Sequence, residues 1–269
     1  MFLTALPLFS ENIELLTEQE KASSWTGMVK FAPEHARGKG TCFILYGRYP
    51  TPLMYKKYIP VSEDKSYVLQ VSFRSLDPAK RASGYMGLQL LDKDKRVIGF
   101  KNVQVFDKTE TCTVSAVKGE KKLTVKEISG MKIPKRFSVA FNIRKDFSDL
   151  PNFEVTSLVK SVTPDGKGNL LLELAAPLQK SYSAGTAVRF HSPWSPSMYY
   201  LGSGWVPEKG VVHKVVIKGI SKESGTPVRK FWKGTKYVRP FVWFGNWNRI
   251  PGKDAKLLVD GFSFEACGK

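Results

Sequence analysis

The residue types best suited to chemistry crowd into residues 229–253, near the end of the chain. Seven of these residues are Lys or Arg, seven are Phe, Trp or Tyr, and none is Asp or Glu. Aromatic faces beside fixed cations stack on flat or ring-shaped ligands and attract negative charge. This combination favours a binding surface over a catalytic site.

Alternation with a period of two from Tyr237 to Phe244 predicts that the middle of this stretch is a β-strand. Both of its faces are largely apolar, so one must meet a core while the other can meet a ligand. A sugar ring packs its C–H groups on an aromatic face, and a few polar groups then fix its orientation. The side chains that we predict to bind such a ligand are Trp232, Tyr237, Arg239, Trp243, Trp247 and Arg249, with Lys233 and Lys236 as further charges and Trp194, Tyr199, Tyr200 and Trp205 as a second rim.

Any single ring of this set could instead belong to a core, because large aromatic side chains also dominate cores. Trp243 and Phe241 fit a core as well as they fit a ligand-facing position. Trp247 lies between Asn246 and Asn248, which predicts an exposed loop tip. Trp247 is therefore the ring that we most expect to meet solvent.

Patterns for catalysis are sparse. The three histidines, His35, His191 and His213, have no partner at a metal-binding spacing, and the chain has no phosphate loop, nucleophile elbow or dinucleotide fingerprint. No strand carries the pair of carboxylates that glycoside hydrolysis requires. We therefore expect a protein that is not an enzyme. A polysaccharide lyase is the alternative, because the two tyrosines of residues 55–58 together with His191 could supply its acid and base.

The net charge of +18 at pH 7 is the strongest global feature, and its largest share lies after position 190, where 13 basic residues face 5 acidic ones. Such a charge attracts an anionic polysaccharide, a nucleic acid or a membrane surface, although it also fits a merely basic soluble protein.

Stacked rings and cations also suit single-stranded nucleic acid. The basic residues are spread over the whole chain and not gathered in one motif, which favours a glycan over a nucleic acid. A structural or protein-interaction role is the third alternative.

The cysteines and the N-terminal residues do not indicate the cellular compartment of the protein. The odd number of cysteines, Cys42, Cys112 and Cys267, excludes a fully paired disulfide framework. The apolar residues 1–9 lack a basic segment, so they fit a trimmed export signal or a first strand. No run reaches the length of a membrane span, and we expect none.

Many short strands joined by punctuated turns predict an all-β protein, an antiparallel β-sandwich. The chain has 22 Gly and 16 Pro, and 12% of its residues are aromatic. Residues 107–190 differ in texture, with short strands and a hairpin turn at 164–168. They predict a small β-barrel or sheet inserted between the two halves of the sandwich, 1–106 and 191–269. One continuous sandwich with long loops is the alternative.

Two parts of the chain resemble the jelly-roll carbohydrate-binding modules, which share a galactose-binding-like β-sandwich fold. In the first half the similarity lies in Trp25, in a Gly-containing turn leading into a strand at 37–46, and in residues 56–71. In the second half it lies in Trp205 before the strand at 211–217, and in the closing residues 257–262. The resemblance implies a jelly roll that binds a polysaccharide, anionic or otherwise complex, outside the cell or at its surface. It also implies that the chain could be an accessory module of a carbohydrate-active enzyme, and it leaves 107–190 unexplained.

The resemblance implies a structural Ca²⁺ as well. In many such modules a carboxylate of the closing strand holds the ion against the N-terminal segment. Asp260 has the matching position, and Glu14 lies in the loosely matching run 12–15. An ionised carboxylate on an apolar strand face must be paired or coordinated. The alternative is a β-bulge at Gly261 in which Asp260 bonds to backbone amides or to a basic side chain.

Overall fold

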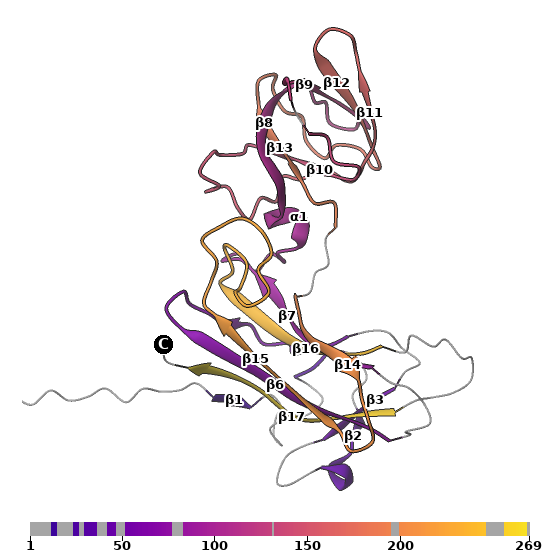
Figure 1. Ribbon diagram of the computed structural model, residues 1–269, viewed down its shortest axis with the longest axis vertical. Helices are drawn as coiled ribbons and strands as arrows, with labels where there is room; N and C mark the ends of the chain where they lie inside the picture. Colours follow the sequence, from indigo (N-terminus) through magenta and orange to yellow (C-terminus); the bar gives the residue numbers. More distant parts are fainter. Residues whose placement is uncertain are drawn as a thin grey trace, which may run out of the picture.

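The regular secondary structure of the described residues is nearly all antiparallel β-strand (Figure 1). The computed structural model describes residues 12–14, 24–26, 30–36, 42–46, 52–76, 83–130, 132–194, 199–245 and 256–267. Helical structure in this part of the chain includes the short helix α1 (Phe100–Val103) and the 3-10 turn η2 (Pro33–His35). No helix among these residues is long and apolar enough to cross a membrane. The predicted all-β class is confirmed.

Two of the three sheets form a β-sandwich. The first has the strand order β15-β6-β17-β3-β2, with β1 beside β17, and the second has the order β14-β7-β16-β4, with β5 beside β16. The strands are β1 (Asn12–Glu14), β2 (Lys30–Phe31), β3 (Phe43–Tyr46), β4 (Leu53–Met54), β5 (Ile59–Pro60), β6 (Ser66–Ser75), β7 (Ser83–Leu91), β14 (Tyr199–Trp205), β15 (Val211–Lys218), β16 (Tyr237–Gly245) and β17 (Lys256–Cys267).

The strands of the sandwich pair in a nested order. β3 pairs with β17, β4 with β16, β6 with β15 and β7 with β14, and all four pairs are antiparallel. Among these eight strands the first therefore meets the last, and the fourth meets the fifth. This is the strand order of a jelly roll, in which a long two-stranded ribbon is wrapped into two facing sheets.

Alternate side chains of these strands fill the sandwich core. In β6, Tyr67, Leu69, Val71 and Phe73 are buried, whereas the residues between them are only half-buried. A strand shows this alternation when one of its faces meets a core and the other does not. These side chains belong to one apolar cluster with residues of the second sheet, such as Val242 of β16. One face of each sheet is thus committed to the core.

A separate β unit is inserted between β7 and β14, the fourth and fifth strands of the jelly roll (Figure 1). Its sheet has the order β10-β13-β8-β9-β12-β11. It has an apolar cluster of its own, to which Phe137, Leu172 and Phe190 belong. The strands are β8 (Val105–Ser115), β9 (Lys122–Lys126), β10 (Ser138–Phe141), β11 (Val159–Pro164), β12 (Asn169–Leu174) and β13 (Ala187–His191). The insert thus runs from Val105 of β8 to His191 of β13.

Hydrogen bonds hold this insert to the sandwich through α1. The backbone N–H of Asn152 donates to the carbonyl of Asn102, and Nδ2 of Asn102 donates to the carbonyl of Asn152, both at 2.9 Å. On the other side of α1, the N–H of Gly225 donates to the carbonyl of Val103 at 2.8 Å. The short helix therefore joins the insert to the loop between β15 and β16.

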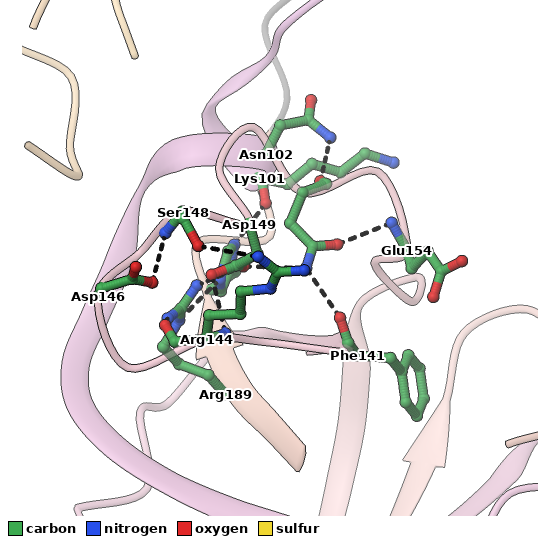
Figure 2. A network of polar contacts seen from close by, with 11 residues as sticks. Lys101, Asn102, Phe141, Arg144, Asp146, Ser148, Asp149, Glu154 and Arg189 are labelled. Carbon is green, nitrogen blue, oxygen red and sulfur yellow. Dashed lines mark hydrogen bonds and ion pairs between the residues drawn. The ribbon is translucent and has the colours of Figure 1, made fainter. Parts of the chain in front are cut away.

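A buried ion pair inside the insert lies next to this junction (Figure 2). Nη2 of Arg189 donates to Oδ2 of Asp149 at 2.8 Å, and the two side chains are 0% and 6% exposed. Nε of Arg189 donates to Nε2 of His191 at 3.2 Å, so the histidine carries its proton on Nδ1, which lies 2.8 Å from the carbonyl oxygen of Lys101. Burial lowers the pKa of His191 to about 4, so this histidine is neutral at pH 7.

Candidate ligand-binding face

The outer face of the second sheet gathers aromatic side chains around β16. This strand turns Val238, Val242 and Phe244 into the core, so the side chains that alternate with them point away from the core. The register sets them opposite β7 in the pairs Tyr237 with Leu91, Arg239 with Gln89, Phe241 with Gly87 and Trp243 with Tyr85. We call the outward side chains Tyr58, Tyr85, Tyr200, Tyr237, Phe241 and Trp243, with Gln89 and Arg239, the aromatic face.

The rings of the aromatic face lie in contact. The centroid of Tyr85 is 5.3 Å from that of Trp243 and 6.2 Å from that of Tyr200. Tyr200 meets Phe241 edge to face, with the centroids 5.5 Å apart. Phe241 is fully buried beneath its neighbours, whereas Tyr200 is 42% exposed. The rings therefore form a layer in which Phe241 lies underneath and Tyr200 is exposed to solvent.

Polar groups lie among these rings. Nε of Arg239 donates to the carbonyl of Tyr55 at 2.8 Å, and Nη1 of Arg239 donates to Oε1 of Gln89 at 3.4 Å. Nε1 of Trp243 is buried and has no hydrogen-bond partner among the described residues. Burial raises the pKa of Tyr200, so its phenol keeps its proton at neutral pH and can donate a hydrogen bond. The face offers a ligand both flat surfaces and hydrogen-bonding groups.

Four of the residues predicted to bind a ligand lie on the aromatic face: Tyr200, Tyr237, Arg239 and Trp243. They come from β14 and β16, which are separated in the sheet by β7 alone. Trp194 is 62% exposed and lies in the connection between β13 and β14, where Arg136 of the insert stands 5.2 Å from its ring centroid. Trp247 and Arg249 lie outside the described residues.

Trp232 requires a correction, because it is a core residue. It is 1% exposed, and its ring packs between Phe100 at 4.9 Å and Tyr199 at 5.4 Å. It precedes β16, so the alternation of that strand does not apply to it. Tyr199 is also buried, and its hydroxyl donates to the carbonyl of Pro227 at 3.0 Å. Neither ring can form a platform for a ligand.

The sequence interpretation missed three members of the face, Tyr58, Tyr85 and Gln89. Tyr85 and Gln89 alternate with buried residues along β7, a signal that the sequence does contain. What the sequence did not reveal is that β7 lies beside β16, some 150 residues later. Tyr58 follows β4, and its ring reaches Tyr237 at 6.5 Å.

The two residues predicted to bind Ca²⁺ come from neighbouring strands. β1 pairs with β17 so that Glu14 is opposite Ser263, and the register of β17 shifts between Asp260 and Ser263. Oδ1 of Asp260 accepts the N–H of Gly261 at 2.9 Å, and Gly261 has a φ of 55°. These are the features of the predicted β-bulge. No group of three potential metal ligands occurs among the described residues, and the Ca²⁺ site stays a prediction.

Two of the groups on which the lyase alternative depends are buried. Tyr55 is 2% exposed and His191 is 0% exposed, so neither can reach a polymer. Burial also lowers the pKa of His213, whose ring packs against Phe73 with the centroids 5.8 Å apart. These histidines are parts of the structure and not of an acid–base pair on the aromatic face.

Comparison with known proteins does not identify a relative of this chain. No protein-family model, no curated protein and no solved structure matches the chain. The function therefore has to be inferred from the arrangement of its own residues.

Proposed function

We propose that the protein binds a polysaccharide along the aromatic face, as a binding module without catalytic activity of its own. The observation that carries this proposal is the layer of contacting rings on neighbouring strands, with Tyr58 and Tyr200 exposed by 40% and 42%. Sugar rings pack well on such surfaces, and exposed apolar patches often mark binding sites.

The length of the face also suits a polymer. Trp243 lies six positions after Tyr237 along β16, so the two residues stand about 20 Å apart at the rise of an extended strand. Several consecutive sugar rings fit along this distance. Gln89, Arg239 and the hydroxyl of Tyr200 can orient them, since each sugar presents hydroxyl groups that donate and accept hydrogen bonds.

Removal of single rings tests the proposal. We expect Tyr200→Ala to weaken binding at least tenfold, because aromatic residues at the centre of an interface carry much of its free energy. Affinity electrophoresis and calorimetry against a panel of neutral, uronate-containing and sulfated polysaccharides measure the loss. The thermal unfolding midpoint shows whether the fold is kept, and Trp243→Ala, whose ring is more deeply set, separates loss of binding from loss of stability.

Trp194→Ala is the matched control, because it removes an exposed ring from outside the aromatic face. If Trp194→Ala abolishes binding and Tyr200→Ala does not, the site lies elsewhere. A single-stranded oligonucleotide is run in parallel. If the protein binds the oligonucleotide but no polysaccharide, and Tyr200→Ala weakens that binding in the same way, the ligand of the aromatic face is a nucleic acid and not a glycan.

A further inference from the structure

Two cations stand over one exposed ring at an end of the aromatic face. Nζ of Lys95 is 4.8 Å from the ring centroid of Tyr58, and Cζ of Arg239 is 5.4 Å from the same centroid. Lys95 also lies 6.0 Å from the ring of Tyr237. Attraction to the ring faces holds both cations in place. Two positive charges from distant parts of the chain therefore meet at a ring that a ligand can reach.

Arg239 is fixed by neutral groups. Its guanidinium donates to the backbone carbonyl of Tyr55 and to the amide oxygen of Gln89, which is itself 9% exposed. These bonds set its orientation without neutralising its charge. A guanidinium held in this way is ready to form charge-assisted hydrogen bonds, which are stronger than those between neutral groups.

The two carboxylates of the turn that carries Lys95 interact with other groups of the turn and not with Lys95. Asp92 accepts the backbone N–H groups of Asp94 and Arg96 and pairs with the Arg96 side chain at 2.7 Å. Asp94 pairs with Lys93 at 3.0 Å and with Arg96 at 3.4 Å. Lys95 adopts a left-handed conformation with φ at 61°. Within the described residues, Lys95 has no carboxylate at ion-pair distance.

We propose that Tyr58, Lys95 and Arg239 form a subsite for the carboxylate or sulfate group of an acidic sugar. The inference rests on the proposed function and narrows it, because it makes the glycan anionic. A sugar that stacks on Tyr58 brings its charged substituent beside two cations, and the anion relieves the repulsion between them. The solvent-exposed Lys95 is the selective member of the subsite, since its charge has no internal partner.

The test compares ligands that differ only in charge. Oligogalacturonate is paired with its fully methyl-esterified form, and a heparin-derived oligosaccharide is paired with its desulfated form. The unmodified protein is expected to bind each acidic member about tenfold more tightly than its neutral partner, a difference typical of one well-placed charged contact. The preference is expected to shrink in high salt, which screens an exposed charge.

Lys95→Gln is the diagnostic variant, and Lys93→Gln is its matched control. Both remove one positive charge from the same exposed turn, so the overall charge of the protein is the same in the two variants. We expect Lys95→Gln to lose about tenfold in affinity for the acidic ligands and little for the neutral ones. We expect Lys93→Gln to bind all four ligands as the unmodified protein does.

Each other outcome has a definite meaning. If neutral and acidic members bind equally, or if the two variants lose equal affinity, the subsite is wrong while glycan binding stands. Binding of neutral polysaccharides alone overturns the inference in the same way. Failure of every glycan to bind the unmodified protein overturns the proposed function and the inference together.

Discussion

Gly87 is the residue that makes room for the aromatic face. A Cβ atom at this position would lie 2.3 Å from the carbonyl oxygen of Tyr199 and 2.4 Å from Cζ of Phe241. Both distances are far shorter than van der Waals contact, and one of the atoms belongs to the backbone. The absent side chain lets Phe241 lie across β7, where Tyr200 packs on it.

We expect Gly87→Ala to destabilise the protein and to weaken ligand binding. Overpacking of a filled site costs about 1–3 kcal/mol, and the displaced Phe241 ring would disturb Tyr200 above it. Urea denaturation measures the first effect and calorimetry with the bound polysaccharide measures the second. Gly166→Ala is the control. A Cβ there meets nothing within 4 Å, and its φ of 72° adds only backbone strain. Equal effects of the two variants on binding would contradict this account.

At the scale of elements, the sequence predicted strands and their faces better than it predicted neighbours. The alternation of β16 correctly placed Tyr237, Arg239 and Trp243 on one side of a strand. Trp232 was misassigned because aromatic density along the chain does not show which rings other elements will cover. Phe100 covers that ring from α1, more than 130 residues away in sequence. The face itself depends on the pairing of β7 with β16, which no local pattern encodes.

The junction between α1 and the insert makes stability depend on pH. Burial lowers the pKa of His191 to about 4, the hydrogen bond to the Lys101 carbonyl opposes this shift, and the charge of Arg189 adds to it. In the unfolded chain the pKa of histidine is about 6.5. The unfolded state therefore binds the proton first as the pH falls, so stability is full above pH 6.5 and declines toward pH 4. Between pH 7 and 5 we expect a loss of about 2 kcal/mol from this group.

Urea denaturation at pH 7 and pH 5 measures the dependence, and His191→Gln shows how much of it belongs to His191. The variant is expected to be less stable at pH 7 and to depend less on pH. His213→Gln is the matched control, because burial lowers the pKa of His213 too but this residue lies outside the junction. An unchanged pH dependence in His191→Gln would show that the pKa of His191 is the same in the folded and unfolded states, against this account.

At the scale of the whole molecule, positive charge acts in two ways. The net charge of +18 attracts anionic polymers from a distance without selecting among them. Salt at 0.1 M screens exposed charges separated by more than about 10 Å, so this general attraction fades first. In the proposed subsite, Lys95 and Arg239 act at short range, and we expect this contact to discriminate between ligands. The amino-acid composition predicted the long-range attraction. The short-range contact could be inferred only from the positions of the side chains.

The molecule has two apolar cores joined at α1. The sandwich core and the insert core share no residue, and hydrogen bonds at α1 link the two units, with Phe153 of the insert packed against the sandwich core. A unit with its own core can open while its neighbour stays folded. The aromatic face belongs to the sandwich alone, so we expect the proposed ligand binding not to require the insert core.

Leu172→Ala tests this separation. Leu172 is fully buried in the insert core, and its truncation is expected to cost about 2–5 kcal/mol. Hydrogen exchange should speed up in residues 105–191 while residues 66–75 stay protected, and affinity for the polysaccharide should not change. Leu257→Ala, the same change at a fully buried site in the sandwich core, should show the opposite pattern and weaken binding. Equal loss of protection in both units after Leu172→Ala would mean that the junction couples them into one cooperative body.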